Sequence, residues 1–249
     1  MEIMNEKPII IDKIISIEWD MFASVNEGKE RASCQEDKRT FVGMRAAQFS
    51  AWSLKAVASY LNDLEKARQN GRNLLEEKYI HMEVIEKGMR TYAAHRQVFE
   101  NAGKRPAFPA KPEDYAITSK MKTTEPSRYD ALLSRVTRPT DASIALAGEV
   151  TNKLLEQTRV LFEKYPNVSG CGRPLYTSFD NVDTSIETYQ FSELLTYSET
   201  TITALYEHIA VLENVGVSLA RVIFENTVMF YGYDSLETAE AAMKESDIS

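Results

Sequence analysis

The chain has very few cysteines and lacks long apolar runs. Only Cys34 and Cys171 occur among its 249 residues, too few for a disulfide framework. No stretch reaches the roughly 18 apolar residues of a membrane span. The opening sequence, MEIMNEKPIIIDK, is charged too early to be typical of a signal peptide. These absences predict a soluble, cytoplasmic protein that does not enter a membrane.

Motifs for nucleic acids, nucleotides and metals are also missing. The net charge is −8 and no Lys- or Arg-rich run could follow a phosphate backbone, so nucleic acid is not an expected partner. Neither a Walker nor a Rossmann pattern is present. Di-iron helical proteins need two Glu-x-x-His motifs, and this chain has none. Glu77 and His81 stand one turn apart, which is more typical of a solvated helix face than of a metal site. We therefore expect no metal and no cofactor.

The pattern of apolar residues predicts an all-α fold. Ile11, Ile14, Ile15 and Phe22 recur at helical spacing, so residues 9–25 are expected to form an amphipathic helix. Asp37 and Ser53 are natural caps for the next two helices, and Gly71 suits the left-handed turn that ends the second. Further helices are expected over the following ranges: 73–90 with an extension through 101, 141–165, 184–199, 201–213, 216–230 and a weakly packed one over 235–244. Asp183 is the expected cap of the helix at 184.

Two parts of the sequence resemble diverged copies of one helical unit. A shift of 145 positions places Met44 on Tyr189 and Trp52 on Tyr197, and it also superimposes Gly71 on Gly216. These matches preserve apolar positions and a turn glycine. We therefore predict an internally duplicated helical bundle whose two pseudo-symmetric copies share one core.

The predicted organisation is one compact domain in three parts. Residues 1–101 form the first copy, 102–139 a Pro-rich connection, and 140–249 the second copy with a short C-terminal helix. Prolines limit any helix in the connection to two or three turns. A connection of this length either wraps the surface or covers a site as a lid.

Polar residues interrupt the apolar helical stripes at related positions. Gln48 in the first copy corresponds to Glu193 in the second, and Glu18 lies on the apolar face of the first helix. Burying a carboxylate is costly unless it is paired or solvated. Each carboxylate is therefore expected either in an internal ion pair with Arg31, Arg45 or Arg173 or in a ligand site built from the same groups. The tyrosines at helical spacing in the second copy are either core residues or the lining of a pocket.

An arginine occurs in each of the two polar loops that precede helix starts. Arg31 lies in GKERASCQED and Arg173 in GCGRPLYTSFDNVDTS, where backbone N–H groups and a guanidinium suit a carboxylate or phosphate. Cys34 follows Arg31 near a helix N-terminus, and both features lower a thiol pKa. With no histidine nearby in sequence, Cys34 is either a nucleophile or, as we favour, a structural thiol.

Several of these segments resemble an uncharacterised helical family, the domain of unknown function 4125. The resemblance covers most of residues 9–236 outside the Pro-rich connection. In the family, two glycines usually precede the loop arginine. Here Gly28 is followed by Lys29-Glu30 before Arg31, so this loop is altered. The resemblance implies that Arg31, Cys34, Gln35, Asp37, Arg173 and the 183–189 segment matter, but it implies no reaction. The segments that carry it are EWDMF (18–22), Val25-Asn26, RASCQED (31–37), TF (40–41), Met44-Arg45, Gln48-Phe49, Trp52, GRP (172–174), DTSIETY (183–189), Glu193-Leu194 and Tyr197-Ser198.

The favoured hypothesis is an enzyme that acts on a small, polar, amino-acid-like or carboxylate-bearing metabolite, in a biosynthetic pathway. The alternative is a non-catalytic helical scaffold or regulatory module that binds a partner protein. Self-association is left open, and the reaction class is not predicted. The residues expected to take part in catalysis are Glu18, Glu187, Glu193 and Cys34. Those expected to bind substrate are Arg31, Gln35, Asp37, Arg45, Gln48, Trp52, Arg173, Thr184, Ser185, Tyr189 and Tyr197.

Overall fold

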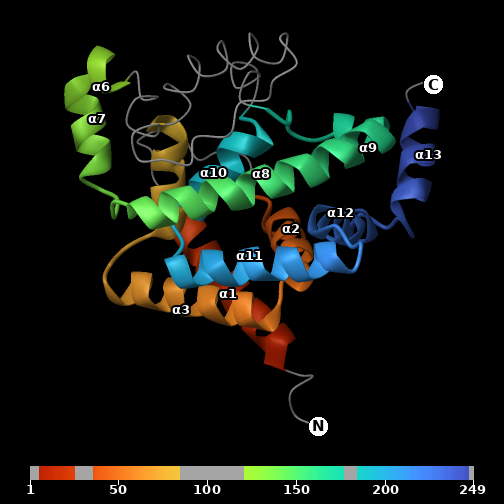
Figure 1. The fold of residues 1–249 in the computed structure, drawn as a ribbon, viewed down its shortest axis with the longest axis horizontal. Coiled ribbons are helices and arrows are strands. Elements are labelled where there is room, and N and C mark those ends of the chain that lie inside the picture. Colours follow the sequence, from red (N-terminus) through yellow and green to blue (C-terminus); the bar gives the residue numbers. More distant parts are fainter. Residues whose placement is uncertain (1–5, 26–35, 85–120, 177–183, 247–249) are drawn as a thin grey trace. The chain divides into compact units, whose positions relative to one another are not determined.

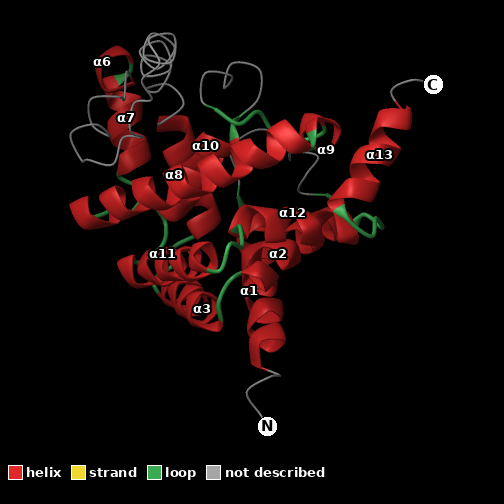
Figure 2. Cartoon of the chain, turned by 45° about the vertical axis from the view of Figure 1, so that its right-hand side comes forward, coloured by secondary structure: helices red, strands yellow, loops and turns green. Residues whose placement is uncertain are grey.

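The computed structural model describes residues 6–25, 36–84, 121–176 and 184–246, and within these ranges all regular secondary structure is helical (Figures 1 and 2). The all-α prediction is therefore confirmed for this part of the chain. None of the described helices is both long and apolar enough to cross a membrane. The helices are α1 (Glu6–Ser24), α2 (Lys38–Ala51), α3 (Leu54–Gln69), an unlabelled helix over 74–84, α6 (Met121–Thr124), α7 (Pro126–Leu133), α8 (Asp141–Lys164), α9 (Pro166–Gly170), α10 (Ile186–Leu194), α11 (Glu199–Asn214), α12 (Leu219–Phe230) and α13 (Leu236–Ser246).

Several predicted helix ends are confirmed by their hydrogen bonds. The Asp37 carboxylate accepts from Thr40 N, and the Ser53 hydroxyl accepts from Ala56 N, so these residues cap α2 and α3. Gly71 follows α3 with φ of 66°, the left-handed conformation that glycine adopts at little cost. The local sequence thus determines where these helices begin and end.

The predicted start of the helix after residue 183 is wrong. α10 begins at Ile186, and its N-cap is Ser185, whose hydroxyl accepts from Thr188 N; Asp183 lies outside the described residues. The loop after α9 also bonds this helix start, because Ile186 N donates to Pro174 O at 2.8 Å. The predicted helix through 199 instead ends at Leu194, and α11 begins at Glu199.

The chain divides into two compact units, each made from segments of both predicted copies. Unit 1 comprises Met1–Glu76, Val160–Cys171 and Thr203–Ser249, and unit 2 comprises Glu77–Arg159 and Gly172–Ile202. The division falls within α8 and α11, so both helices contribute residues to both units. The organisation as residues 1–101, 102–139 and 140–249 stays a prediction.

In unit 1, α1 packs against α2 and α3, and α2 packs against α12. Gly43 permits the contact between α2 and α12, because a Cβ at this position would lie 2.2 Å from the Phe230 ring. Asn226 Nδ2 also donates to Ala47 O at 3.0 Å. Met44, one of the apolar positions matched between the two predicted copies, is 42% exposed. The glycine beside it faces α12 instead, so the methionine turns toward solvent.

In unit 2, part of the Pro-rich connection contributes to the core. Tyr129 and Leu132 of α7 cluster with Ile80 and Val84 of the 74–84 helix. Pro126 occupies the first turn of α7, where its missing N–H leaves no helical bond unmade. Residues 126–133 therefore pack as part of the unit. Residues 102–120 of the connection lie outside the described residues, so the lid hypothesis for 102–139 stays untested.

Local backbone structure repeats at the shift of 145 positions. Ser53 and Ser198 each accept a hydrogen bond from the backbone N–H three residues later. Gly71 and Gly216 both have positive φ, 66° and 72°. The N–H of the residue after each glycine donates to the carbonyl five residues back, a helix-ending motif that also occurs at Gly232. The same serine cap also occurs at Ser185 and Ser218, so these features are general to the helix ends of this chain, and the duplication stays a prediction.

The C-terminal helix α13 packs more firmly than the sequence suggested. Leu236 and Ala239 are fully buried in a cluster with residues of α8 and α12. Glu240 accepts from Asn167 N at 3.0 Å and from Val168 N at 2.9 Å, so its carboxylate caps the start of α9. The prediction of weak packing is wrong. The hydrogen bonds of the Glu240 carboxylate add to the apolar contacts of Leu236 and Ala239, and the apolar stripe of the helix does not reveal these bonds.

We expect Glu240→Ala to lower the free energy of unfolding by about 1–2 kcal/mol, because it leaves the first N–H groups of α9 without their carboxylate cap. Urea denaturation followed by circular dichroism measures this change. Glu245→Ala, at an exposed position on the same helix, is the matched control and should change stability by less than about 0.5 kcal/mol. Equal effects of the two substitutions would show that the cap contributes nothing specific.

Candidate functional site

Unit 1 contains a buried ion pair between α1 and α2. Glu18 is fully buried and Arg45 is 5% exposed. Arg45 Nε donates to Glu18 Oε2 at 2.6 Å, and Arg45 Nη2 also donates to Glu18 Oε1. Tyr60 of α3 donates its hydroxyl to Glu18 Oε1 at 2.6 Å. Both carboxylate oxygens are thus bonded to core side chains, which confirms the ion-pair hypothesis for Glu18 and Arg45.

Two other predicted residues lie beside this pair. Gln48 Oε1 accepts from Arg45 Nη1 at 2.9 Å. Trp52 is 3% exposed and packs edge-on against Phe49, whose ring centroid is 5.1 Å away. Gln48 is half-buried, and together with Trp52 it completes a polar and aromatic cluster in unit 1.

Asp37, another predicted residue, is exposed and caps α2. The hydrogen bond that it accepts from Thr40 lowers the pKa of its carboxyl.

A second buried ionic cluster lies in unit 2, on one face of α10. Glu193 Oε1 accepts the Tyr197 hydroxyl at 2.6 Å, and Glu193 Oε2 lies 3.3 Å from Lys78 Nζ. Glu193 is 6% exposed and Lys78 only 2%. The expectation that Glu193 is a buried, paired carboxylate is confirmed, although its cation is a lysine rather than the expected arginine.

The ring of Tyr189 joins this cluster to an exposed arginine. Lys78 Nζ lies 3.8 Å from the Tyr189 ring centroid, and Arg173 Cζ lies 5.0 Å from it. Arg173 Nη1 donates to Thr184 O at 3.0 Å, so the loop carbonyl fixes the guanidinium. Arg173 is exposed whereas Lys78 is buried. A surface cation and an interior cation therefore contact the same half-buried aromatic ring.

Sequence reasoning missed Lys78, although a signal for it exists. Lys78 lies four residues after Leu74 and four before Met82, and both of these are buried. Residues four apart share one face of a helix, so a lysine here interrupts an apolar stripe as Glu193 does. Applying the same criterion to cations as to carboxylates would have identified it.

The predicted solvated face at Glu77 and His81 is wrong. Glu77 is 3% exposed and His81 is fully buried. Burial lowers the pKa of His81 to about 4, because the interior disfavours the charged imidazolium. Ile80 and Val84 continue into the unit 2 core, so packing turned this face inward. Among the described residues, no group of three or more His, Cys, Asp or Glu side chains is placed to hold a metal.

The remaining predicted residues divide between described and undescribed parts. Glu187 is fully buried near the start of α10, and Ser185 is the N-cap of that helix. Arg31, Cys34 and Gln35 lie outside the described residues, so their predicted roles stay predictions. Cys171, the other cysteine, is exposed, and its Sγ lies 3.9 Å from Met243 Sδ.

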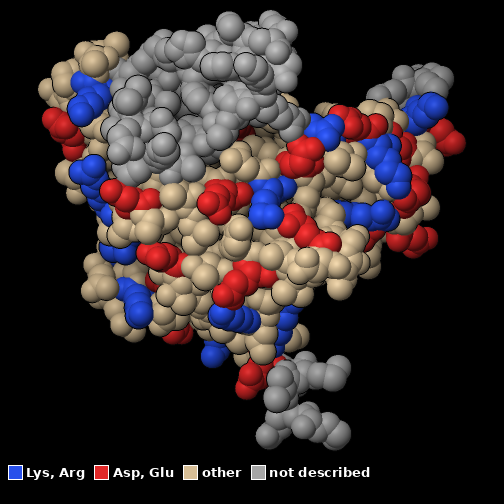
Figure 3. Space-filling model, in the orientation of Figure 1, with Lys and Arg blue, Asp and Glu red and all other residues tan. Residues whose placement is uncertain are grey.

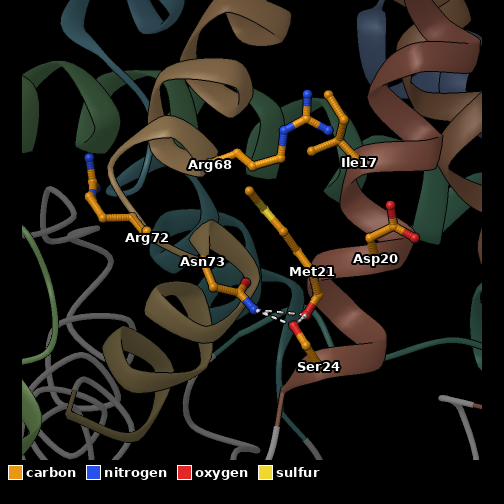
Figure 4. A pocket seen from close by; sticks show the side chains of 8 residues that line it. Ile17, Asp20, Met21, Ser24, Arg68, Arg72 and Asn73 are labelled. Carbon is orange, nitrogen blue, oxygen red and sulfur yellow. Dashed lines mark hydrogen bonds between the residues drawn. The ribbon is translucent and has the colours of Figure 1, made fainter.

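An open hollow of about 270 Å³ in unit 1 is lined by other residues (Figure 4). Asn73 Nδ2 closes one side by donating to Met21 O at 2.8 Å and Ser24 Oγ at 3.1 Å. In Figure 4, Arg68 extends toward Ile17, whereas Arg72 points away. None of the predicted site residues is among those lining it. On the face drawn in Figure 3, acidic and basic side chains are interspersed over the described residues.

The described residues define the class of this protein: it is helical, with a buried ionic cluster in each of two units. The chain belongs to the family described as "Protein of unknown function (DUF4125)", whose model matches residues 8–241. The resemblance seen in the sequence is thereby confirmed over nearly the whole chain. No curated protein and no solved structure matched the chain.

We expect Arg45→Met to lower the free energy of unfolding by about 3–5 kcal/mol, because it leaves the Glu18 carboxylate buried without its cation. The double substitution Glu18→Leu with Arg45→Met should recover most of this loss, because both charges are then absent. Urea denaturation of the two variants measures the coupling. Arg39→Met, at an exposed position on the same helix, is the control. A double variant no more stable than Arg45→Met alone would contradict this account.

His81 should make unit 2 less stable in acid. The pKa of His81 in the folded protein is about 4, below its ordinary value of 6.5. Between pH 4 and 6.5 this imidazole is therefore protonated in the unfolded chain but neutral in the folded protein. Stability from this group is complete above pH 6.5 and falls as the pH drops toward 4, by about 3 kcal/mol in total. Urea denaturation between pH 7 and 4.5 should show this slope in the wild type and in His208→Gln, but a smaller slope in His81→Gln. An unchanged slope in His81→Gln would rule out this residue as the cause.

Proposed function

We propose that the protein is a cytoplasmic enzyme that acts on a small, carboxylate-bearing, amino-acid-like metabolite in a biosynthetic pathway. In this proposal Arg173 holds the carboxylate and Glu193 moves protons. The observation that carries it is the pair of cations, Arg173 and Lys78, that contact the Tyr189 ring beside a buried carboxylate. Cations that converge on one place favour an anionic ligand.

Arg173 supports this proposal through its position and its shape. It is exposed, so a dissolved anion can reach it, and its contacts with Thr184 O and the Tyr189 ring fix its orientation. A planar guanidinium in a fixed orientation matches the two oxygens of a carboxylate. Lys78 lies deeper and adds positive charge behind the ring.

Glu193 is the favoured group for proton transfer. The Tyr197 hydroxyl and the Lys78 ammonium each contact one of its oxygens, so a proton can pass between groups already in contact. Glu187, buried on the same helix, is the second candidate. Glu18 is better explained as a structural residue, because Arg45 and Tyr60 bond both of its oxygens.

The internal duplication is part of the same proposal. The sequence matches at a shift of 145 positions, including Gly71 with Gly216, support it. In a duplicated bundle, Arg31 of the first copy would be the counterpart of Arg173. The two copies would then share one core, with each contributing an arginine loop.

A second candidate function, binding of a partner protein, is favoured by exposed apolar side chains in unit 1. Val211 and Val215 are 61% and 70% exposed near the end of α11, and Met229 of α12 is 59% exposed. Apolar side chains that gather at a surface mark interaction sites in many proteins. In that case the buried ionic clusters would serve stability alone.

We expect Arg173→Ala to abolish the stabilisation by ligand, because it removes the exposed cation that holds the carboxylate. The measurement is a thermal shift screen with the twenty amino acids, their 2-oxo acids and the corresponding decarboxylated amines. Carboxylates should raise the melting temperature of the wild type, and the amines should not. Arg173→Ala should lose this response while its circular dichroism spectrum stays unchanged.

Arg159→Ala is the matched control, because Arg159 is a partly exposed arginine of unit 2 whose guanidinium bonds Glu156. It should respond to carboxylates as the wild type does. A screen without any carboxylate response, together with capture of one stoichiometric protein that Val211→Asp and Val215→Asp prevent, would reject the enzyme in favour of the partner-binding module.

A further inference from the structure

Two hydroxyl groups in the interior of unit 2 lack hydrogen-bond partners. Thr151 of α8 and Ser192 of α10 are both fully buried, and neither Thr151 Oγ1 nor Ser192 Oγ has a partner within the described residues. A buried hydroxyl gives up its bonds to water on folding, so leaving it unpaired is unfavourable. Native proteins keep few such groups, and those kept often belong to functional sites.

Neighbouring hydroxyls show that the local backbone could have satisfied them. Thr158, two turns further along α8, donates to Leu154 O at 2.7 Å. Thr196, just after α10, donates to Glu193 O at 2.8 Å. Both use a backbone carbonyl three or four residues earlier, the usual partner of a buried hydroxyl in a helix. Thr151 and Ser192 do not make this bond, so helical geometry alone does not explain them.

Ser192 lies on the face of α10 that carries the candidate site. Tyr189 precedes it by three residues and Glu193 follows it directly, and residues three or four apart share one side of a helix. Thr151 lies on the buried face of α8, between Ala147 and Leu154. α8 runs past α10 in both views of the chain (Figures 1 and 2). Thr151, Ser192, Lys78 and Glu193 are thus all buried residues of unit 2.

The chemistry of the two residues indicates what they would bind. Each hydroxyl can donate one hydrogen bond and accept others, and both are neutral. The Glu193 carboxylate is already paired with Lys78 and bonded by Tyr197, so a ligand ammonium here would bring a second positive charge, whereas a ligand hydroxyl can accept from one side chain and donate to the other. A neutral hydroxyl is thus the best complement to Thr151 and Ser192.

We infer that Thr151 and Ser192 bind a hydroxyl group of the metabolite, so that the substrate is a hydroxylated carboxylic or amino acid. This inference rests on the proposed function, in which Arg173 holds the carboxylate of the same molecule. Thr151 and Ser192 are then specificity-determining residues. They distinguish a substrate that has the hydroxyl from an analogue that lacks it, because the analogue leaves both protein groups unpaired.

Isothermal titration calorimetry with two matched probe pairs tests this inference. L-serine is compared with L-alanine, and L-malate with succinate, so each pair differs by one hydroxyl. For at least one pair, the wild type should bind the hydroxylated member at least about tenfold more tightly. Thr151→Val and Ser192→Ala should each bring this ratio toward one. Thr158→Val should keep the wild-type ratio, because its hydroxyl is already bonded to the backbone.

The melting temperature of the protein without ligand is a second, independent measurement. Thr151→Val removes an unpaired hydroxyl, so the melting temperature should stay the same or rise, whereas Thr158→Val should lower it. Thr151→Ser retains the hydroxyl and should retain the binding ratio, which keeps the test decisive if the valine variant folds poorly. A Thr151→Val protein that melts as low as Thr158→Val would overturn the inference, because the hydroxyl would then serve the fold.

The binding results separate this inference from the proposed function. If both members of each pair bind equally and binding requires Arg173, the hydroxyl inference is overturned and the carboxylate site stands. If none of the four probes binds and the wider carboxylate screen is also negative, the proposed function fails and the inference fails with it. Discrimination that survives both Thr151→Val and Ser192→Ala would place the hydroxyl elsewhere and also overturn the inference.

Discussion

A carboxylate inside a helical core needs a partner, and this need organises both units. Glu18 can remain fully buried only because Arg45 bonds it through two nitrogens and Tyr60 adds a third bond. These contacts tie α1, α2 and α3 together at one point. Glu193 meets the same need in unit 2 through Lys78 and Tyr197. In each unit, elements distant in sequence are held in register by a charge that cannot be left unpaired.

The two clusters differ in how far their partners reach toward solvent. In unit 1 the hydrogen bonds run from Glu18 through Arg45 to Gln48, and the aromatic rings of Phe49 and Trp52 pack around them. In unit 2 the contacts run from Glu193 through Lys78 and the Tyr189 ring to an exposed arginine. A cluster that ends at the surface is accessible to a dissolved ligand. The same physical requirement thus produces a structural core in one unit and a candidate site in the other.

Much of the helical framework was predictable because its determinants are local. A serine, threonine or aspartate before an apolar stripe caps a helix through its own backbone neighbours, as Asp37 and Ser53 do. A glycine with positive φ ends a helix wherever the chain needs that conformation, as at Gly71. The prediction failed where a nonlocal bond competed. Ser185, rather than Asp183, caps α10, at a point where the Pro174 carbonyl also bonds the helix start.

The sequence by itself determined that the chain is helical, where most described helices begin, and that Glu18, Gln48 and Glu193 interrupt apolar faces. These properties depend on spacing and on neighbours within a few residues. Only the tertiary structure decided which cation meets each carboxylate, that Lys78 and His81 are buried, and that Thr151 and Ser192 lack partners. A side chain's spacing along a helix shows which face it occupies. What that face meets depends on packing between segments that may be 27 or 115 residues apart in the chain.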